Sequence, residues 1–199
     1  FPTRELFQEK IKDFDLIIFD RYQRRGILPS IYFDNIARYV REGGAVLIAA
    51  GPDYASPTSL WHTPLEPLLP AEPSGQVTEA AYRPELSALG RRHPVTRGLD
   101  GANETPPRWS PWFRLVDATV NQGMTVMQGP ENKPMLVLAR EGEGRVALLL
   151  SDQIWLWSRN HDGGGPQQEL LRRTAHWLMR EPELEEESLT ARIEAGQLL

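Results

Sequence analysis

Two short apolar runs enclose one amphipathic segment in the first quarter of the chain. The runs are residues 15–20, with Asp15 and Asp20 at their ends, and residues 45–50; short continuous runs of this kind are typical of strands buried on both faces. Between them, apolar side chains recur at helical spacing until a Gly pair at 43 and 44: Phe33, Ile36, Ala37 and Val40. A strand, a helix and a strand joined by short connections predict a right-handed parallel crossover, the unit of doubly wound sheets. The sequence therefore predicts an α/β domain.

The second half of the chain predicts further strands of the same sheet. Residues 124–127, 134–139 and 145–150 are strand candidates, and the Glu-Gly-Glu-Gly stretch at 141–144 is typical of a tight hairpin. We therefore expect a mixed sheet, parallel in the middle and antiparallel at one side. Residues 56–111 are rich in Pro and aromatic residues and predict loops, short helices and one edge strand.

Two further helices are expected, at residues 4–12 and after Pro166. Proline suits the first turn of a helix, where its missing N–H is not needed. Leu171, Ala175 and Leu178 then share one face of the final helix. We expect this face to pack on the sheet.

The composition narrows the functional classes. The net charge of −5 gives no general attraction to phosphate backbones or anionic lipids, so nucleic acids and membrane surfaces are not expected partners. The chain contains no Cys, which excludes disulfides, thiolate nucleophiles and thiolate metal ligands. No apolar run approaches the ~20 residues needed to span a bilayer, so this stretch is not expected to cross a membrane.

Several segments, in order along the chain, resemble the trehalose-utilisation (ThuA-like) branch of the class I glutamine amidotransferase-like superfamily. The matching segments are 15–20, 39–44, 45–50, 92–99, 142–146 and 170–179. The resemblance implies a three-layer α/β/α, flavodoxin-like, doubly wound fold whose sheet is mostly parallel with antiparallel edge strands. More closely, the chain resembles the amidotransferase-like domain of large membrane-anchored bacterial proteins of unassigned function. It implies a soluble domain of such a protein, with the side of the membrane left open.

The same resemblance suggests the boundaries of the domain. The family's first strand would lie upstream of Phe1, so we expect residues 1–182 to form the domain without that strand. Apolar residues alternate near the C-terminus and predict a strand there: Leu189, Ala191, Ile193 and Ala195. Residues 183–199 are therefore expected to be an extension that leads into a following β element.

The glutaminases of this superfamily use a Cys nucleophile after a central strand, a His base, and a Glu that orients the base. The resemblance places the nucleophile's turn at Ala50 and Gly51, neither of which can attack an amide carbonyl. It places the base just after residue 150, where the chain reads Ser-Asp-Gln and has no His. We therefore expect no glutaminase activity and no catalytic residues of this kind. We interpret the chain as a degenerate, non-catalytic binding or interaction domain of a larger bacterial protein.

Ligands of doubly wound sheets bind beyond the carboxyl ends of the strands. Eight residues follow predicted strands and form a candidate crevice: Asp20, Arg21, Tyr22, Gly51, Asp53, Ser151, Asp152 and Gln153. Two interpretations stay open. Carboxylates that converge there would support the alternative function, a hydrolase or other enzyme acting on a small, carbohydrate-like substrate. Carboxylates that only end strands or cap helices would not.

No metal ion and no cofactor are expected, because the four His residues, at 62, 93, 161 and 176, lack the spacing that places two ligands on one face. Trp155 and Trp157 form a candidate interface, since alternation about Leu156 would turn one of them outward in an extended segment. The expected partners are proteins or other domains of the same chain. An exposed sheet edge would also allow a homodimer.

Overall fold

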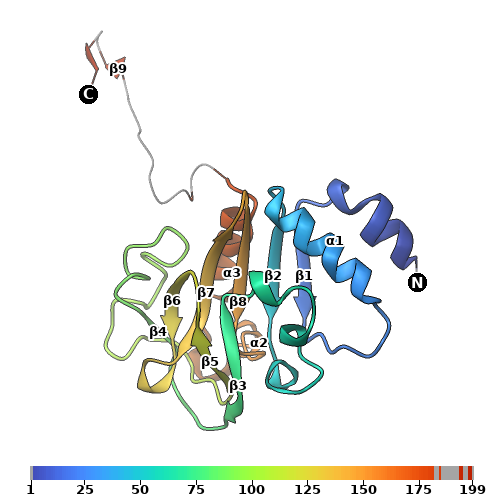
Figure 1. Ribbon diagram of the computed structural model, residues 1–199. Helices are drawn as coiled ribbons and strands as arrows, with labels where there is room; N and C mark the ends of the chain where they lie inside the picture. The colour runs from blue at the N-terminus through green and yellow to red at the C-terminus, as the bar shows by residue number, and fades with distance from the viewer. Residues whose placement is uncertain (1, 182–183, 185–192, 195–196, 199) are drawn as a thin grey trace.

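The computed structural model describes residues 2–181, 184, 193–194 and 197–198, and it shows a mixed α/β domain (Figure 1). The strands are β1 (Ile17–Asp20), β2 (Ala45–Ala49), β3 (Ala71–Thr78), β4 (Glu85–Leu86), β5 (Leu115–Val120), β6 (Met124–Gln128), β7 (Pro134–Glu141), β8 (Gly144–Leu149), β9 (Ile193–Glu194) and β10 (Gln197–Leu198). The α-helices are α1 (Ser30–Arg41), α2 (Trp155–Ser158) and α3 (Gln167–Leu178). The short helical turns are η1 (Glu5–Glu9), η2 (Ile11–Asp13), η3 (Pro52–Ala55), η4 (Leu60–His62), η5 (Glu66–Leu68), η6 (Pro130–Asn132) and η7 (His161–Gly163).

The main sheet has six strands in the order β1-β2-β8-β7-β6-β4. β1, β2 and β8 are parallel, whereas β7, β6 and β4 each run antiparallel to the strand before them in this order. The predicted mixture of parallel and antiparallel strands is confirmed, but the expectation of a mostly parallel sheet is wrong. Only Gly142 and Glu143 separate β7 from β8, and a turn of two residues can join only antiparallel neighbours.

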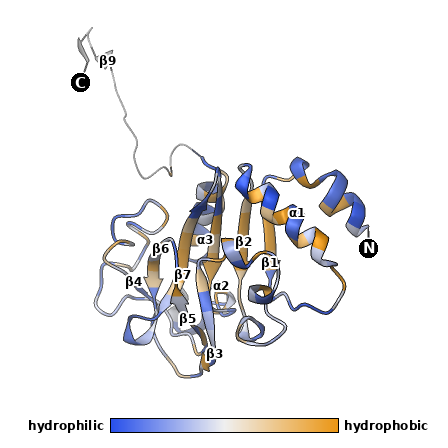
Figure 2. Ribbon diagram, in the orientation of Figure 1, coloured by the Kyte–Doolittle hydropathy of each residue, from blue (hydrophilic) through white to orange (hydrophobic). Residues whose placement is uncertain are grey.

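The core lies on and between the central strands. β8 is buried at every position and β2 at all but its last residue, and Figure 2 shows hydrophobic residues concentrated along these strands. This pattern is typical of strands covered on both faces. It explains why the apolar runs at 45–50 and 146–150 are continuous rather than alternating.

Two helices cover the parallel half of the sheet, with α1 in front of it and α3 behind it in Figure 1. α1 buries Phe33, Ile36, Ala37 and Val40, as their spacing predicts. α3 buries Leu170, Thr174, Trp177 and Leu178, whereas Leu171 and Ala175 are only half-buried. The predicted packing face of this helix is therefore displaced by one residue. Arg145, buried at the start of β8, donates from Nη1 to the Trp177 carbonyl at 2.6 Å and stacks on the Trp177 ring, which turns that face toward the sheet.

A two-stranded antiparallel ribbon, β3 paired with β5, was not predicted. β3 contains Pro73 and Gly75, residues that normally interrupt strands, and the pairing shifts register between Pro73 and Val77. Neither strand therefore has the clean alternation that signals a strand. The ribbon contacts η3 and β7 and so anchors the long irregular segment to the sheet.

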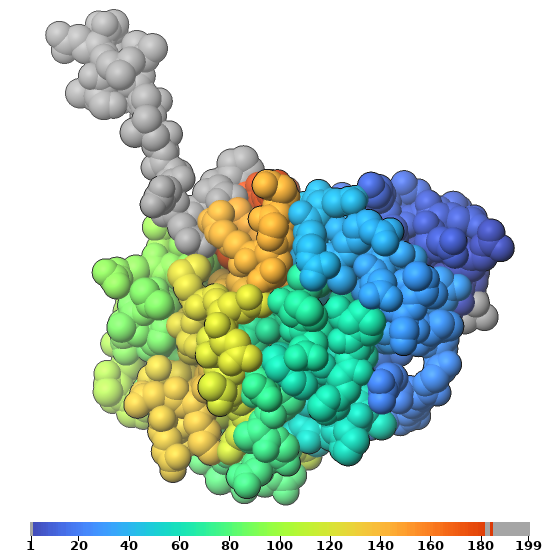
Figure 3. Space-filling view, viewed as in Figure 1, coloured from blue at the N-terminus to red at the C-terminus, as the bar shows by residue number. Residues whose placement is uncertain are grey.

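The N-terminal segment differs from its predicted helix, whereas a strand near the C-terminus was expected and β9 contains Ile193. The predicted helix at 4–12 is a π-helical turn followed by a 3₁₀ turn, and this segment lies against α1 (Figure 3). There the rings of Phe7 and Tyr32 have centroids 6.0 Å apart. At the C-terminus, β9 and β10 form a short antiparallel pair. Leu189, Ala191 and Ala195 lie outside the described residues.

Across the described part of the chain, no helix has both the length and the apolarity needed to cross a bilayer.

Candidate functional site at the carboxyl edge of the sheet

The three parallel strands end at one edge of the sheet, and the residues that follow them lie together there. Backbone hydrogen bonds continue the ladders past the strand ends: Arg21 N donates to the Ala49 carbonyl at 2.9 Å, and Ala50 N donates to the Leu149 carbonyl at 2.8 Å. The segments 20–22, 50–53 and 151–153 are thereby held side by side. The structure thus brings the predicted crevice segments to a common edge.

Asp152 is the electrostatic centre of this edge. Its side chain is only 6% exposed and forms ion pairs with two arginines: Arg114 Nη1 lies 3.1 Å from Oδ2, and Arg21 Nε lies 3.3 Å from the same oxygen. Arg114 Nε lies 3.6 Å from Glu79 Oε1 as well. A buried carboxylate needs such partners because desolvation penalises an unpaired charge. Arg114 was not among the crevice residues predicted from the sequence, because it follows no predicted strand.

Gly51 occupies the turn where a glutaminase-like nucleophile was expected. A Cβ at this position would lie 3.1 Å from Arg21 Nε and 3.5 Å from Asp152 Oδ2. The Arg21–Asp152 ion pair therefore fills the space beside residue 51. Arg21 itself has a φ of 46°, a left-handed conformation that is uncommon for a residue with a side chain.

Ser151 and Gln153 hold a neighbouring segment in place. Ser151 is buried, and its Oγ donates to the Arg114 carbonyl at 2.6 Å; Tyr82 OH donates to the same carbonyl at 3.0 Å. Gln153 Oε1 accepts from Phe113 N at 2.5 Å. Burial raises the pKa of the Tyr82 phenol, which therefore stays a donor at ordinary pH. These polar groups are thus committed to supporting residues 113–114.

The other predicted crevice residues do not join a shared carboxylate cluster. Asp53 accepts a hydrogen bond from Gln23 Nε2, and Asp20 is exposed. The Tyr22 ring packs between Phe19 and Phe33, at centroid distances of 5.4 and 6.0 Å, and burial raises its pKa. Among the described residues, no three His, Asp or Glu side chains are placed to hold a metal ion together. The convergence of Asp20, Asp53 and Asp152 required by the alternative function is therefore not observed.

Tyr54, the residue after Asp53, connects this turn to β3. It is buried, and its hydroxyl donates to the Ala71 carbonyl of β3 at 2.8 Å. Burial raises the pKa of this phenol strongly. The turn after β2 is therefore tied to the β3–β5 ribbon by a neutral side chain.

The two tryptophans of the candidate interface have different environments. Residues 155–158 form α2 and not the extended segment assumed from the sequence, so the expected alternation does not apply. Trp155 is 52% exposed, whereas Trp157 is buried against Trp109 and Trp112, at centroid distances of 5.3 and 4.9 Å. Trp157 therefore drops out of the candidate interface. Phe113, which is also exposed, lies beside Gln153 and 6.0 Å from the His161 ring.

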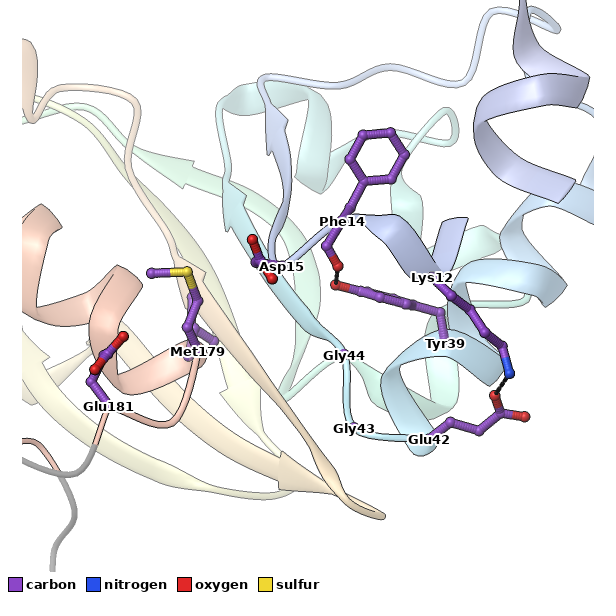
Figure 4. A pocket seen from close by; sticks show the side chains of 10 residues that line it. Lys12, Phe14, Asp15, Tyr39, Glu42, Gly43, Gly44, Met179 and Glu181 are labelled. Carbon is purple, nitrogen blue, oxygen red and sulfur yellow. Dashed lines mark hydrogen bonds and ion pairs between the residues drawn. The ribbon is translucent and has the colours of Figure 1, made fainter. Parts of the chain in front are cut away.

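A hollow of about 600 Å³ lies at the opposite, amino edge of the parallel strands (Figure 4). It is lined by Lys12, Phe14, Asp15, Tyr39, Glu42, Gly43, Gly44, Leu178, Met179 and Glu181. Two contacts join lining residues: Tyr39 OH donates to the Phe14 carbonyl at 2.9 Å, and Lys12 Nζ lies 2.7 Å from Glu42 Oε2, which lowers the pKa of that carboxyl. The other carboxylates that line the hollow are Asp15 and Glu181.

No protein-family model matches the chain, and no curated protein matches it. Solved structures do match. The chain is similar to the cytoplasmic protein STM3548 from Salmonella typhimurium, with a TM-score of 0.69 and 17% identity over 85% of this chain and 74% of that one. It is also similar to the cytoplasmic protein STM1381 from Salmonella typhimurium LT2, with a TM-score of 0.60 and 18% identity over 93% of this chain and 80% of that one. The mmIFT52 N-terminal domain matches with a TM-score of 0.60 and 15% identity over 86% of this chain and 80% of that domain.

The structural similarity shows a shared fold, and at these low sequence identities it shows nothing about activity. The similarity extends over most of the chain. The resemblance to glutamine amidotransferase-like domains is not tested by these matches and stays a prediction.

Proposed function

We propose that this chain is a degenerate glutamine amidotransferase-like domain, of three-layer flavodoxin-like architecture, that acts as a non-catalytic binding or interaction module. Its place in a larger, membrane-anchored bacterial protein belongs to the proposal and rests on the sequence resemblance. The observation that carries the non-catalytic role is the Arg21–Asp152–Arg114 network at the carboxyl edge. It occupies the position where this kind of fold would place its chemistry.

Residue 51, where the resemblance places the nucleophile, has no reactive group, and the space beside it is occupied by Arg21 and Asp152. Gly51 has no side chain, and a Cβ at this position would lie 3.1 Å from Arg21 Nε, which is a tight contact. Introducing a nucleophilic side chain would therefore require Arg21 to shift. The site therefore differs from a glutaminase site in the surroundings of residue 51 as well as in the absence of the nucleophile.

The residues at the base's position have structural tasks instead. Asp152 neutralises two arginines, and Ser151 and Gln153 bind the backbone at 113–114. A general base must be free to accept a proton from a bound substrate. A carboxylate that is 6% exposed and paired twice is poorly suited to that task.

The surface beside this network supports the binding part of the proposal. Trp155 and Phe113 both expose aromatic side chains. Trp155 follows Gln153 by two residues, and Phe113 N donates to the Gln153 side chain. Exposed aromatic residues are enriched at protein interfaces, where they bury a large area with little loss of side-chain entropy. A protein or another domain of the same chain is the partner that fits.

The catalytic question is tested by measuring turnover of glutamine and of a panel of nitrophenyl glycosides. Wild type, Asp152→Asn and the surface control Asp34→Asn, at an exposed position on α1, would be compared. We expect no turnover above background in any of the three. Turnover by wild type would overturn the proposal, and its loss in a folded Asp152→Asn but not in Asp34→Asn would place the activity at the carboxyl edge.

The binding question is tested in the full-length parent protein with a photo-crosslinking amino acid at position 155. Position 89, where Leu89 is exposed elsewhere on the domain, serves as the control. We expect crosslinks to another protein or domain from 155 and few from 89. Equal crosslinking at the two sites, or none at 155, would contradict an interface at Trp155.

A further inference from the structure

The hollow at the amino edge of the parallel strands has walls from three parts of the core. The segment that leads into β1, the turn that follows α1 and the turn that follows α3 each contribute lining residues. In Figure 4, Asp15 lies between the turn after α3 on one side and the Lys12–Glu42 pair on the other. A volume of about 600 Å³ is within the range of small-molecule sites in proteins.

The lining of this hollow is acidic, and two of its carboxylates have no cationic partner. Three carboxylates and one ammonium group line it. The ammonium group of Lys12 is paired with Glu42, whereas neither Asp15 nor Glu181 forms an ion pair within the described part of the chain. Arg180, next to Glu181 in the chain, lies 4.0 Å from Glu143 instead. The hollow therefore has an excess of negative charge.

The ends of two helices add to this negative potential. α1 and α3, each 12 residues long, end at the hollow, and their C-caps, Glu42 and Met179, are among its lining residues. The C-terminal end of a helix carries about half a unit of negative charge. The basic residues of the last turns, Arg38, Arg41 and His176, do not line the hollow. A cation bound there would be stabilised by both helix ends and by the carboxylates.

The remainder of the lining is apolar or aromatic. Phe14 is 39% exposed and Met179 37% exposed, and both lie in the wall of the hollow. The Tyr39 ring is held in place, because its hydroxyl donates to the Phe14 carbonyl and accepts from Ala45 N at 3.2 Å. Burial raises the pKa of this phenol and the charge of Asp15 raises it further, so Tyr39 stays neutral. Such a surface suits methylene groups and the face of a cation.

The arrangement of the carboxylates favours an organic cation over a metal ion. A metal ion needs several ligands that converge on one point. Within the described ranges, no three His, Asp or Glu side chains are grouped in that way. An alkyl chain with an ammonium group at each end needs no such convergence, since each end pairs with a separate carboxylate.

We propose that this hollow binds a small aliphatic diamine, with one ammonium group at Asp15, the other at Glu181, and the methylene chain against Phe14 and Met179. The site is at the edge of the sheet opposite to the Arg21–Asp152–Arg114 network. The proposal is therefore independent of the proposed function, and each can fail without the other.

The first test compares ligands of similar length and different charge by calorimetric titration of the chain. The probes are hexamethylenediamine, the neutral hexanediol and the dianion adipate. We expect binding of the diamine alone, weakened by added salt because the attraction is electrostatic. Absence of diamine binding, or equal binding of hexanediol, would overturn the proposal.

A further probe separates a free diamine from the lysine side chain of a partner protein, which carries the same ammonium chemistry. N-acetyl-lysine amide has one ammonium group and is expected to bind at least about fivefold more weakly than hexamethylenediamine, since it pairs with one carboxylate. Equal affinity would overturn the assignment to a diamine.

The second test locates the site with charge-neutralising variants. Asp15→Asn and Glu181→Gln are each expected to weaken diamine binding at least about fivefold. Glu72→Gln removes an exposed carboxylate from β3, outside the hollow, and is expected to leave the affinity within about twofold of wild type. Circular dichroism checks that the variants are folded. The same affinity in all four proteins would indicate general attraction to an acidic chain and would overturn the proposal.

The methyl resonance of Met179 gives a readout that does not depend on these substitutions. Met179 lines the hollow, so its methyl shift is expected to change with diamine concentration and to saturate at the calorimetric affinity. Calorimetric binding that leaves the Met179 methyl unchanged would place the ligand elsewhere and contradict the proposed site.

Discussion

Arg21 Nε lies 3.3 Å from Asp152 Oδ2, and this contact joins the residue that follows β1 to the buried carboxylate that follows β8. The two residues are more than a hundred positions apart in the chain and meet because their strands are parallel and flank β2. The contact holds the carboxyl edge closed beside Gly51. The first two predictions below follow from it.

Replacing Asp152 is expected to destabilise the domain. Asp152→Ala leaves Arg114, which is about one-third exposed, without its main partner, and it leaves Arg21 free in solvent. Loss of one member of a buried pair costs several kcal/mol, but the exposure of Arg21 screens part of the interaction, so we expect about 2 kcal/mol. Urea unfolding followed by circular dichroism measures this change. Asp20→Ala, at an exposed position, should stay within about 0.5 kcal/mol of wild type.

A side chain at position 51 should conflict with Arg21. Gly51 has a φ of −107°, which any residue adopts, so the cost of Gly51→Val is steric and not conformational. We expect about 1–2 kcal/mol of destabilisation. In an Arg21→Ala background the same substitution should cost less, because the clashing guanidinium is gone. A double-mutant cycle by chemical denaturation measures the coupling, and additive effects would show that Arg21 does not fill this space.

The two tryptophans flanking Leu156 should differ sharply in their contribution to stability. Trp157→Ala removes a buried ring from the cluster with Trp109 and Trp112 and should cost about 3–5 kcal/mol. Trp155→Ala removes an exposed ring and should change the free energy of unfolding by about 0.5 kcal/mol or less. Thermal unfolding of the two variants provides the comparison. Similar losses for both would mean that Trp155 is packed rather than available to a partner.

The start of α3 should show a pH-dependent contribution from Glu169. Hydrogen bonds from Arg172 and Arg173 lower the pKa of this carboxyl from 4.5 to about 2. Because the folded value is below the unfolded one, the stabilisation is present above pH 4.5 and is lost as the pH falls toward 2. Glu169→Gln should therefore lower stability at pH 6 and have no effect near pH 2. Because the Glu169 side chain is 39% exposed, solvent screens these interactions and the effect on stability is expected to be small. An NMR titration of the Glu169 carboxyl checks the pKa directly.

The helices and strands that could be predicted from the sequence are those whose pattern of apolar residues lies within one short segment. The apolar runs at 15–20, 45–50 and 145–150 became β1, β2 and β8, and the spacing of Phe33, Ile36, Ala37 and Val40 defined α1. Burial on both faces leaves a continuous apolar run in the sequence, as at β2 and β8, and burial of one helix face leaves helical periodicity, as at α1. β1 also has a continuous apolar run, but it is the outer strand of the sheet and its Ile18 is 57% exposed, so the prediction of burial on both faces is wrong for β1. The short hairpin between β7 and β8 was predicted from another local signal, the Glu-Gly-Glu-Gly stretch at 141–144.

Local pattern did not predict the β3–β5 ribbon or the helical state of residues 155–158. β3 contains Pro73 and Gly75 and is a strand because β5 pairs with it across the fold, and α2 is only one turn long. Its burial of Trp157 against Trp109 and Trp112 depends on contacts distant in sequence. Long-range pairing and packing of this kind leave little trace in any short window.

The sequence by itself determined which residue types lie at the site, and only the tertiary structure decided which groups they contact. The absence of Cys, Gly51 at the turn and Ser-Asp-Gln at 151–153 could be read directly. The ion pairing of Asp152 could not, because Arg114 approaches it from a segment with no predicted strand, and Arg21 reaches it through a left-handed turn. The charge state and partners of a side chain depend on which distant groups surround it, and only the folded chain fixes those groups in place.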